Sequence, residues 1–149
     1  MANILDKINQ DLIDAQKSKD TVMVSTLRLL LADVKNAQIE KGSELTDEEI
    51  INQIQRGAKK RKESIDAYQK ANRSDLVDKE TRELGVLQKY LPKQLSQDEI
   101  GKIVDEIISE TGARSPGDIG KVIGQVMAKL RGRADGSMVS EIVKSKLSS

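Results

Sequence analysis

The last third of the chain contains basic residues around a glycine, in the stretch Lys129-Leu130-Arg131-Gly132-Arg133-Ala134-Asp135-Gly136. Lysine and arginine neutralise phosphate groups, and a glycine turn leading into a helix can add backbone N–H donors and the positive end of the helix dipole. The pattern predicts an anion site, with an RNA phosphate as the ligand. The residues predicted to form it are Lys121, Lys129, Arg131, Gly132, Arg133 and Lys144. The alternative is an ordinary helix–helix turn with a C-capping glycine and solvated basic side chains.

The charges of this third are segregated along the sequence. Residues 96–119 contain two basic and six acidic residues, whereas residues 120–149 contain six basic and two acidic ones. Over the whole chain, 25 Lys and Arg nearly balance 24 Asp and Glu. The near-zero net charge therefore hides a local excess of positive charge, and binding of a polyanion there should weaken steeply with salt.

A second group of charged residues falls where helical periodicity predicts an apolar face. Arg61 lies within an apolar stripe, and Glu80 and Glu83 lie beside the leucines of the next predicted helix. An antiparallel hairpin would place Arg61 opposite one of these glutamates, as a partly buried structural ion pair that fixes helix register. The alternative is an arginine reserved for an anionic ligand. The basic run over residues 56–62 has acids within a few turns and is interpreted as a solvated helix face.

The composition excludes several kinds of catalytic and metal site. The chain has no His, Cys, Trp or Phe, so it has neither a thiol nucleophile nor a Ser-His-Asp triad, and it lacks the usual zinc ligands. No P-loop pattern for ATP is present. With only two Tyr, a base-stacking platform is not expected. We predict no catalytic residue, no metal and no cofactor.

Apolar segments long enough for a secretory signal or a membrane span are not found. The start, MANILDKINQDL, is too polar for a signal peptide, and no later segment approaches the length of a span. The sequence therefore predicts a cytoplasmic protein with no membrane partner.

The elements that must position these residues are predicted to be helices. Apolar residues recur at helical spacing, and no sustained period-two alternation indicates a strand. Thr46 with Glu49 and Ser96 with Glu99 have the pattern of capping boxes, and Ser115 precedes a proline that can open a helix. The predicted helices cover residues 2–18, 20–41, 46–71, 74–90, 96–111, 116–130 and 136–147.

Pro92 is the predicted domain boundary, because the residue before a proline is disfavoured in helical geometry. The fold class is therefore all-α, with a four-helix N-terminal lobe (residues 1–91) and a small three-helix C-terminal lobe (residues 92–149).

Glycines are concentrated after Pro92, which precedes seven of the ten. Inside a helix each costs about 1 kcal/mol relative to Ala, so something should offset that cost. Gly120 and Gly124 lie four residues apart, a spacing that favours close helix packing over a ligand site. Tyr68 and Tyr90 are expected at the edge of the core, with hydroxyls at the surface or on a backbone carbonyl.

Two motifs resemble a known family. Tyr90-Leu91-Pro92-Lys93-Gln94-Leu95-Ser96, followed by Gly132-Arg133-Ala134-Asp135-Gly136, resembles the GatB/YqeY family, and Lys59-Lys60-Arg61-Lys62-Glu63-Ser64 fits its stand-alone YqeY-like members. The resemblance implies an all-helical protein whose C-terminal domain is similar to the tail of the B subunit of glutamine-dependent aspartyl/glutamyl-tRNA amidotransferase. That tail helps to hold tRNA, whereas the chemistry occurs in a separate, larger domain that this chain lacks.

Taken together, these features predict a non-catalytic protein that binds tRNA or another RNA, or that assists a tRNA-handling enzyme. One alternative is a component with carbon–nitrogen ligase activity that uses glutamine as amide donor, which follows from the family alone. The other is an adaptor that binds a partner helix in an apolar groove between the lobes.

Overall fold

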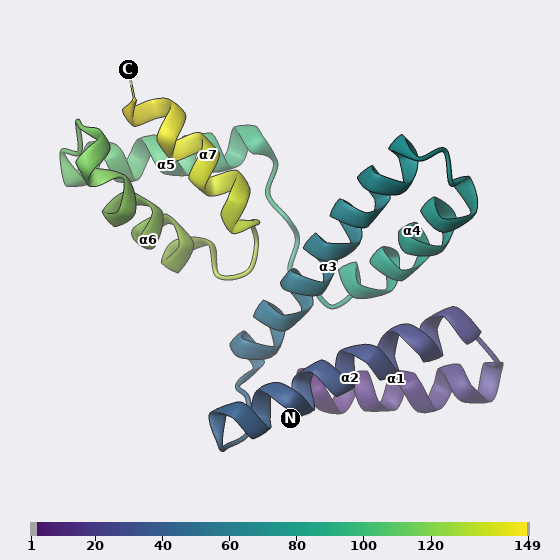
Figure 1. Ribbon diagram of the computed structural model, residues 1–149. Coiled ribbons are helices and arrows are strands. Elements are labelled where there is room, and N and C mark those ends of the chain that lie inside the picture. The colour runs from purple at the N-terminus through teal and green to yellow at the C-terminus, as the bar shows by residue number, and fades with distance from the viewer. Residues whose placement is uncertain (1–2, 149) are drawn as a thin grey trace. The chain divides into compact units, whose positions relative to one another are not determined.

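The computed structural model describes residues 3–148, and over these residues the chain is helical with no strand (Figure 1). The prediction of an all-α fold is confirmed. The helices are α1 (Ile4–Ser18), α2 (Thr21–Lys41), α3 (Asp47–Lys70), α4 (Ser74–Gln88), α5 (Gln97–Thr111), α6 (Ile119–Leu130) and α7 (Gly136–Leu147). Residues Pro116–Asp118, expected at the start of a helix, form the 3-10 turn η1 before α6. The expected helix start at residue 2 lies outside the described residues.

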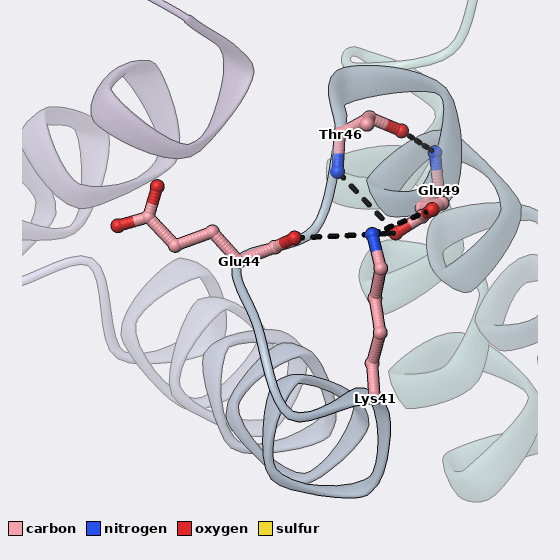
Figure 2. Close-up of polar contacts among 4 residues, drawn as sticks. All are labelled: Lys41, Glu44, Thr46 and Glu49. Atoms are coloured by element: carbon pink, nitrogen blue, oxygen red, sulfur yellow. Dashed lines mark hydrogen bonds and ion pairs between the residues drawn. The ribbon is translucent and has the colours of Figure 1, made fainter.

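Side chains near the helix ends fix where the helices begin. Both predicted capping boxes are present, at Thr46–Glu49 and Ser96–Glu99. Figure 2 shows the first: the Glu49 amide donates to the Thr46 hydroxyl at 3.2 Å, and the Thr46 amide donates to the Glu49 carboxylate at 3.4 Å. Lys41 reaches across from the end of α2 and donates to both Glu49 oxygens at 2.9 Å and to the Glu44 carbonyl at 3.2 Å. The hydrogen bond from Lys41 is the main cause of the lowered pKa of Glu49.

The chain divides into two compact units, Met1–Leu91 and Pro92–Ser149. In the first unit α1 and α2 form one helical hairpin, and α3 and α4 form another (Figure 1). Asn72, in left-handed geometry with φ of 55°, lies in the turn between α3 and α4. The core of this unit is built from Ile8, Leu27, Leu30, Val34, Ile50, Ile54, Val86, Leu87 and Tyr90.

The second unit packs α5, α6 and α7 around a separate core. Its buried members include Ile100 and Val104 of α5, Val122 and Val126 of α6, and Val143 of α7. Each helix contributes residues at a spacing of three or four, as one face of a helix requires. Across residues 3–148, no helix combines the length and the apolar character that crossing a bilayer demands.

Candidate nucleic-acid interface

The turn between α6 and α7 has a tightly defined backbone. Arg131 and Gly132 both adopt left-handed geometry, with φ of 40° and 81°. The Arg131 amide donates to the Met127 carbonyl at 3.1 Å, and the Arg133 amide donates to the Leu130 carbonyl at 3.0 Å. These bonds satisfy carbonyls at the end of α6 that a helix terminus otherwise leaves free. The turn is therefore an ordered helix ending and not an open loop.

The segment before α5 holds this turn from outside. The Leu95 amide donates to the Arg133 carbonyl at 2.8 Å. The Gln94 side-chain amide donates to the Gly132 carbonyl and to the Pro92 carbonyl, each at 2.9 Å. Two carbonyls of the turn are thus bonded to residues almost forty positions earlier in the chain. Gln94 was not among the predicted site residues, although it lies within the Tyr-Leu-Pro-Lys-Gln motif.

The two arginines of the turn point their charges into water. Arg131 and Arg133 are exposed, whereas Ala134 beside them is 2% exposed and anchors the turn in the core. Lys93 adds a further positive charge that sequence reasoning missed. The pKa of Glu99 is lowered, first by hydrogen bonds with Ser96 and then by the nearby charges of Lys93 and Arg133.

The structure does not bring all the predicted basic residues together. Lys129, Arg131 and Arg133 lie at the turn, but Lys129 also forms an exposed ion pair with Glu106 at 3.2 Å. Lys121 lies near the start of α6, about 15 Å along the helix from Arg131 at 1.5 Å per residue. Lys144 belongs to the last turns of α7. The predicted site is therefore a cluster at the turn plus two lysines well away from it.

The backbone amides of the turn are not arranged as expected for an anion site. Those of Arg131 and Arg133 donate within the turn. Asp135 is the N-cap of α7, and its carboxylate accepts from the Ser137 amide at 3.1 Å. The expectation that exposed amides would help to bind the anion is therefore wrong for the amides of Arg131, Arg133 and Ser137. An anion at this turn would therefore not be bound by these amides.

The glycines of α6 also differ from expectation. A Cβ atom built on Gly120 or Gly124 would meet nothing within 4 Å, so the interpretation as close helix packing is wrong. At about 100° per residue, both lie on the same exposed face of α6 as Ala128. This smooth face, which has no side chain larger than a methyl group at these three positions, extends along α6 toward Arg131. Close approach occurs instead at Gly57 of α3, where a Cβ would lie 3.2 Å from Leu87 Cδ1.

The charged group in the first unit is an ion pair between α3 and α4. Arg61 Nε lies 3.3 Å from Glu83 Oε2, with side-chain exposures of 15% and 9%. Arg61 also donates to the Gly57 carbonyl at 3.3 Å, and the exposed Lys79 lies 3.9 Å from Glu83. The glutamate that contacts Arg61 is thus Glu83 and not Glu80. The guanidinium is engaged by protein groups on both sides of the hairpin.

The hydroxyl of Tyr90 bonds to a side chain. It donates to Asp11 Oδ2 at 2.5 Å, while the ring is buried in the core. The expectation that it lies at the surface or on a backbone carbonyl is therefore wrong. Burial first, and then the hydrogen bond to the Asp11 carboxylate, raises the pKa of Tyr90 well above its usual value. Among the described residues, no group of three or more His, Cys, Asp or Glu is arranged to hold a metal ion.

The fold and the basic turn define an all-helical protein with two compact units, the second of which presents exposed arginines. A family model described as Yqey-like protein matches residues 5–147, and the chain belongs to this family.

Curated relatives are found in fungi. An uncharacterised protein of Schizosaccharomyces pombe is 31% identical over 94 residues, which cover 63% of this chain and 76% of the relative. Altered inheritance of mitochondria protein 41, mitochondrial, of Pyrenophora tritici-repentis is 33% identical over 118 residues, covering 76% of this chain and 65% of the relative. The protein of the same name from Lachancea thermotolerans is 31% identical over 112 residues, covering 73% of this chain and 60% of the relative. The chain thus spans less than two thirds of the length of these mitochondrial relatives.

The mitochondrial relatives overturn the expectation of a cytoplasmic protein. That expectation was based on the lack of an apolar stretch near the start of the sequence. An apolar stretch marks a secretory signal, whereas mitochondrial targeting segments are amphipathic and rich in Arg and Ser. The lack of an apolar stretch therefore does not exclude a mitochondrial location.

Proposed function

We propose that the chain is a non-catalytic protein that binds tRNA or another RNA, or that assists a tRNA-handling enzyme. The α6–α7 turn is its phosphate-binding site. The observation that supports it is the pair of exposed arginines, Arg131 and Arg133, on a turn whose carbonyls are bonded by Gln94 and Leu95. Arginine presents a planar fork of donors that matches two phosphate oxygens. A fixed backbone reduces the entropy lost when these side chains engage a ligand.

The conformation of Arg131 supports a role for its side chain. Left-handed geometry costs a non-glycine residue roughly 1–2 kcal/mol, and glycine would avoid that cost. An arginine in this position, with φ of 40°, lowers stability at a surface where, among residues 3–148, its side chain forms no ion pair within 4.0 Å. Phosphate binding would explain why a charged side chain occupies the place.

The smooth face of α6 supports the same use. Gly120 and Gly124 leave open space outside the helix, so a bulky polyanion can approach the α6 backbone closely. Lys121 lies at one end of this face and Arg131 at the other. A nucleic-acid backbone running along α6 would therefore meet positive charge at both ends.

Ligase chemistry with glutamine as amide donor has less support in this chain. Glutamine hydrolysis needs an activated nucleophile, and the chain contains neither Cys nor His. A glutaminase assay on the purified full chain, with and without tRNA, tests this alternative directly. Ammonia released above the buffer blank would favour the ligase, and its absence would leave the binding role.

The binding role is tested by titrating labelled tRNA into the full-length protein at several salt concentrations. We expect Arg133→Gln to weaken binding severalfold and to reduce the slope of log K against log salt by about one. Because the relatives from Pyrenophora tritici-repentis and Lachancea thermotolerans are named as mitochondrial, mitochondrial tRNA belongs beside bulk tRNA among the probes. Absence of tRNA binding at low salt contradicts the proposal.

A matched pair of glycine substitutions separates charge from backbone effects. Lys19 ends α1 in the same left-handed geometry that Arg131 adopts at the end of α6, with φ of 60°. Both Arg131→Gly and Lys19→Gly should raise the free energy of unfolding, because glycine relieves the left-handed strain. Only Arg131→Gly should weaken tRNA binding. Equal tRNA affinities for the two variants would remove Arg131 from the site.

We also infer that residues 1–91 and 92–149 are separate domains, the second similar to the tail of the amidotransferase B subunit. Its support is the pair of separate apolar cores, one in each compact unit. The fragment 92–149 should fold alone, with cooperative thermal unfolding followed by circular dichroism. A fragment without a cooperative transition would contradict this division.

A further inference from the structure

Helix α2 carries a second apolar face that its own unit leaves uncovered. One face of α2 enters the core through Leu27, Leu30 and Val34, which are at most 4% exposed. On the opposite face, Leu29 is 56% exposed and Ile39 is 70% exposed. Large apolar side chains on the two sides of one helix indicate a second partner for that helix.

The spacing on the uncovered face is that of a coiled coil. The residues alternate at three and four positions along the helix, as the a and d positions of a heptad do. This seam consists of Val22, Ser25, Leu29, Ala32, Asn36 and Ile39. It extends over most of α2 (Thr21–Lys41). A period of 3.5 residues keeps a stripe facing a partner helix of the same kind, whereas burial against a globular core needs only a period near 3.6.

Charges on the two edges of the seam identify the partner. Arg28 and Lys35 lie on one edge, and Asp33 and Glu40 lie on the other. In a parallel pair of identical helices each g position faces an e position five residues further along the partner. Arg28 then meets Asp33 of a second copy, and Lys35 meets Glu40. An antiparallel pair would set basic against basic and acidic against acidic.

From this complementarity we propose that α2 is a self-association surface, which forms a parallel two-stranded coiled coil with α2 of a second copy of the chain. Asn36 occupies an a position, where a polar residue specifies register and oligomer state at a cost in stability. Ser25 and Ala32 at d positions are small and add little apolar burial. The association is therefore selective and weak, and it depends on protein concentration.

The edge charges remain available for this contact. Within residues 3–148, none of Arg28, Asp33, Lys35 and Glu40 forms an ion pair shorter than 4.0 Å. A hollow of about 810 Å³ borders the seam on the α1 side, and its lining includes Arg28 and Leu29. A hollow of about 260 Å³ borders it on the α3 side, and its lining includes Asp33 and Glu40. The seam thus stands between two recesses.

The first test is the oligomeric state of the full chain, measured by sedimentation equilibrium from micromolar to near-millimolar concentration. We expect the wild-type chain to dimerise as its concentration rises, and Leu29→Glu to remain monomeric. Met138→Glu is the matched control, because Met138 is also an exposed apolar residue, at 37%, but belongs to α7 in the other compact unit. Circular dichroism should show that both variants keep their helices. A wild-type chain that stays monomeric throughout overturns the proposal.

Charge reversal tests the pairing itself. The double variants Arg28→Glu/Lys35→Glu and Asp33→Lys/Glu40→Lys each place like charges on both edges, so each alone should be monomeric. An equimolar mixture restores opposite charges on both edges and should form a heterodimer. Dimerisation of either variant alone with wild-type affinity would show that the edges do not select the partner. That result would overturn the parallel arrangement.

A cysteine crosslink tests the direction of the helices, since the native chain has no Cys. In the parallel pair the two copies of residue 25 face each other, so Ser25→Cys should form a disulfide-linked dimer under mild oxidation. An antiparallel pair centred on the same seam would separate these positions by about 16 Å along the axis, beyond the reach of a disulfide. An uncrosslinked Ser25→Cys dimer would contradict the parallel arrangement. The double variant Ser25→Cys/Arg131→Gly should crosslink as well as Ser25→Cys alone, which separates this contact from RNA binding.

Discussion

The two compact units treat polar groups in opposite ways. In the first unit polar side chains enter the interior: Thr26 is fully buried, Glu83 is 7% exposed, and the Tyr90 hydroxyl bonds to Asp11. In the second unit every buried residue among those described is apolar. Its charged pairs lie outside, as Lys129 with Glu106 does.

This difference shows two ways of fixing helix register. In the first unit, the ion pair between Arg61 and Glu83 ties α3 to α4 at one level, and any slip would leave a charge buried and unpaired. In the second unit, the Gln94 side chain and the Leu95 backbone amide donate to carbonyls of the α6–α7 turn, and these bonds fix its position without buried charge. The charged side chains of the second unit therefore remain at the surface.

The largest expected effect comes from breaking the buried pair. Glu83→Ala leaves the Arg61 guanidinium, 15% exposed, without its carboxylate. Removing one partner of a buried pair typically costs about 3–5 kcal/mol, and we expect a value near 3 kcal/mol because Arg61 keeps some contact with solvent. Urea unfolding followed by circular dichroism measures the loss.

The double variant Arg61→Met/Glu83→Leu separates register from charge. Because replacing both ions by apolar groups of similar size is often neutral, this variant should recover most of the stability lost in Glu83→Ala. The single variant Arg61→Met should lie between the two, because Lys79 still lies near Glu83. If Arg61→Met is as stable as the wild type, the pair does not fix the register of α3 and α4.

Glycine substitutions compare packing in the two units. Gly124→Ala adds a methyl group in open space on α6, so the gain in helix propensity should raise stability by about 0.5–1 kcal/mol. Gly57→Ala places its methyl group 3.2 Å from Cδ1 of the buried Leu87, so the leucine must shift. The free energy of unfolding of Gly57→Ala should therefore be at least about 1 kcal/mol lower than that of Gly124→Ala. Thermal and urea unfolding of both variants measure the difference. Equal effects would mean that Leu87 moves freely.

Much of the fold could be predicted from the sequence because its signals are local. Apolar spacing and the capping boxes at Thr46 and Ser96 depend on residues within a few positions of one another, and they gave helix ranges close to those observed. The exception is Pro116–Asp118, where Ser115 and Pro116 do open a helical segment, but a 3-10 turn. Local signals do not distinguish that turn from the first turn of an α-helix.

The candidate site was less predictable because its geometry depends on distant residues. The basic run around Gly132 is visible in the sequence, but the bond from Gln94 to that glycine spans 38 positions. The spacing of Gly120 and Gly124 indicated close packing, yet which face of α6 meets a neighbour depends on the tertiary arrangement. The seam on α2 does have a sequence signal, its heptad spacing, which the stronger core stripe on the same helix obscures.

The buried hydroxyl of Tyr90 gives the first unit a response to alkaline pH. Its pKa is raised in the folded state, so the unfolded chain loses this proton first. The stabilisation is complete below the ordinary tyrosine pKa of about 10 and is lost as the pH rises beyond that value. In Tyr68→Phe the only tyrosine is Tyr90, so absorbance at 295 nm reports its ionisation alone. The titration midpoint of Tyr90 should lie at higher pH in the folded protein in buffer than in the chain unfolded in urea.

Asp11→Asn tests the cause of this shift. The substitution keeps the ring buried but removes the charged acceptor of the Tyr90 hydroxyl. Tyr90 should then titrate between its position in the Tyr68→Phe background and its position in urea. No change on substitution would assign the whole shift to burial.

The smallest expected effect is on the exposed pair of the second unit. Lys129 and Glu106 are 3.2 Å apart, with side-chain exposures of 49% and 59%, and pairs of this kind contribute about 0–1 kcal/mol. Glu106→Gln should therefore change the free energy of unfolding by less than about 0.5 kcal/mol, in contrast with Glu83→Ala. If the α6–α7 turn binds phosphate, the same substitution should strengthen tRNA binding at low salt, because it removes a negative charge that competes for Lys129. Glu110→Gln is the matched control, because Glu110 is another exposed acid of α5 but lies in its last turn, at the end opposite the residues that contact the α6–α7 turn. A loss of stability comparable to that of Glu83→Ala would show that exposed charge also holds the second unit together, and the distinction between the two units would fail.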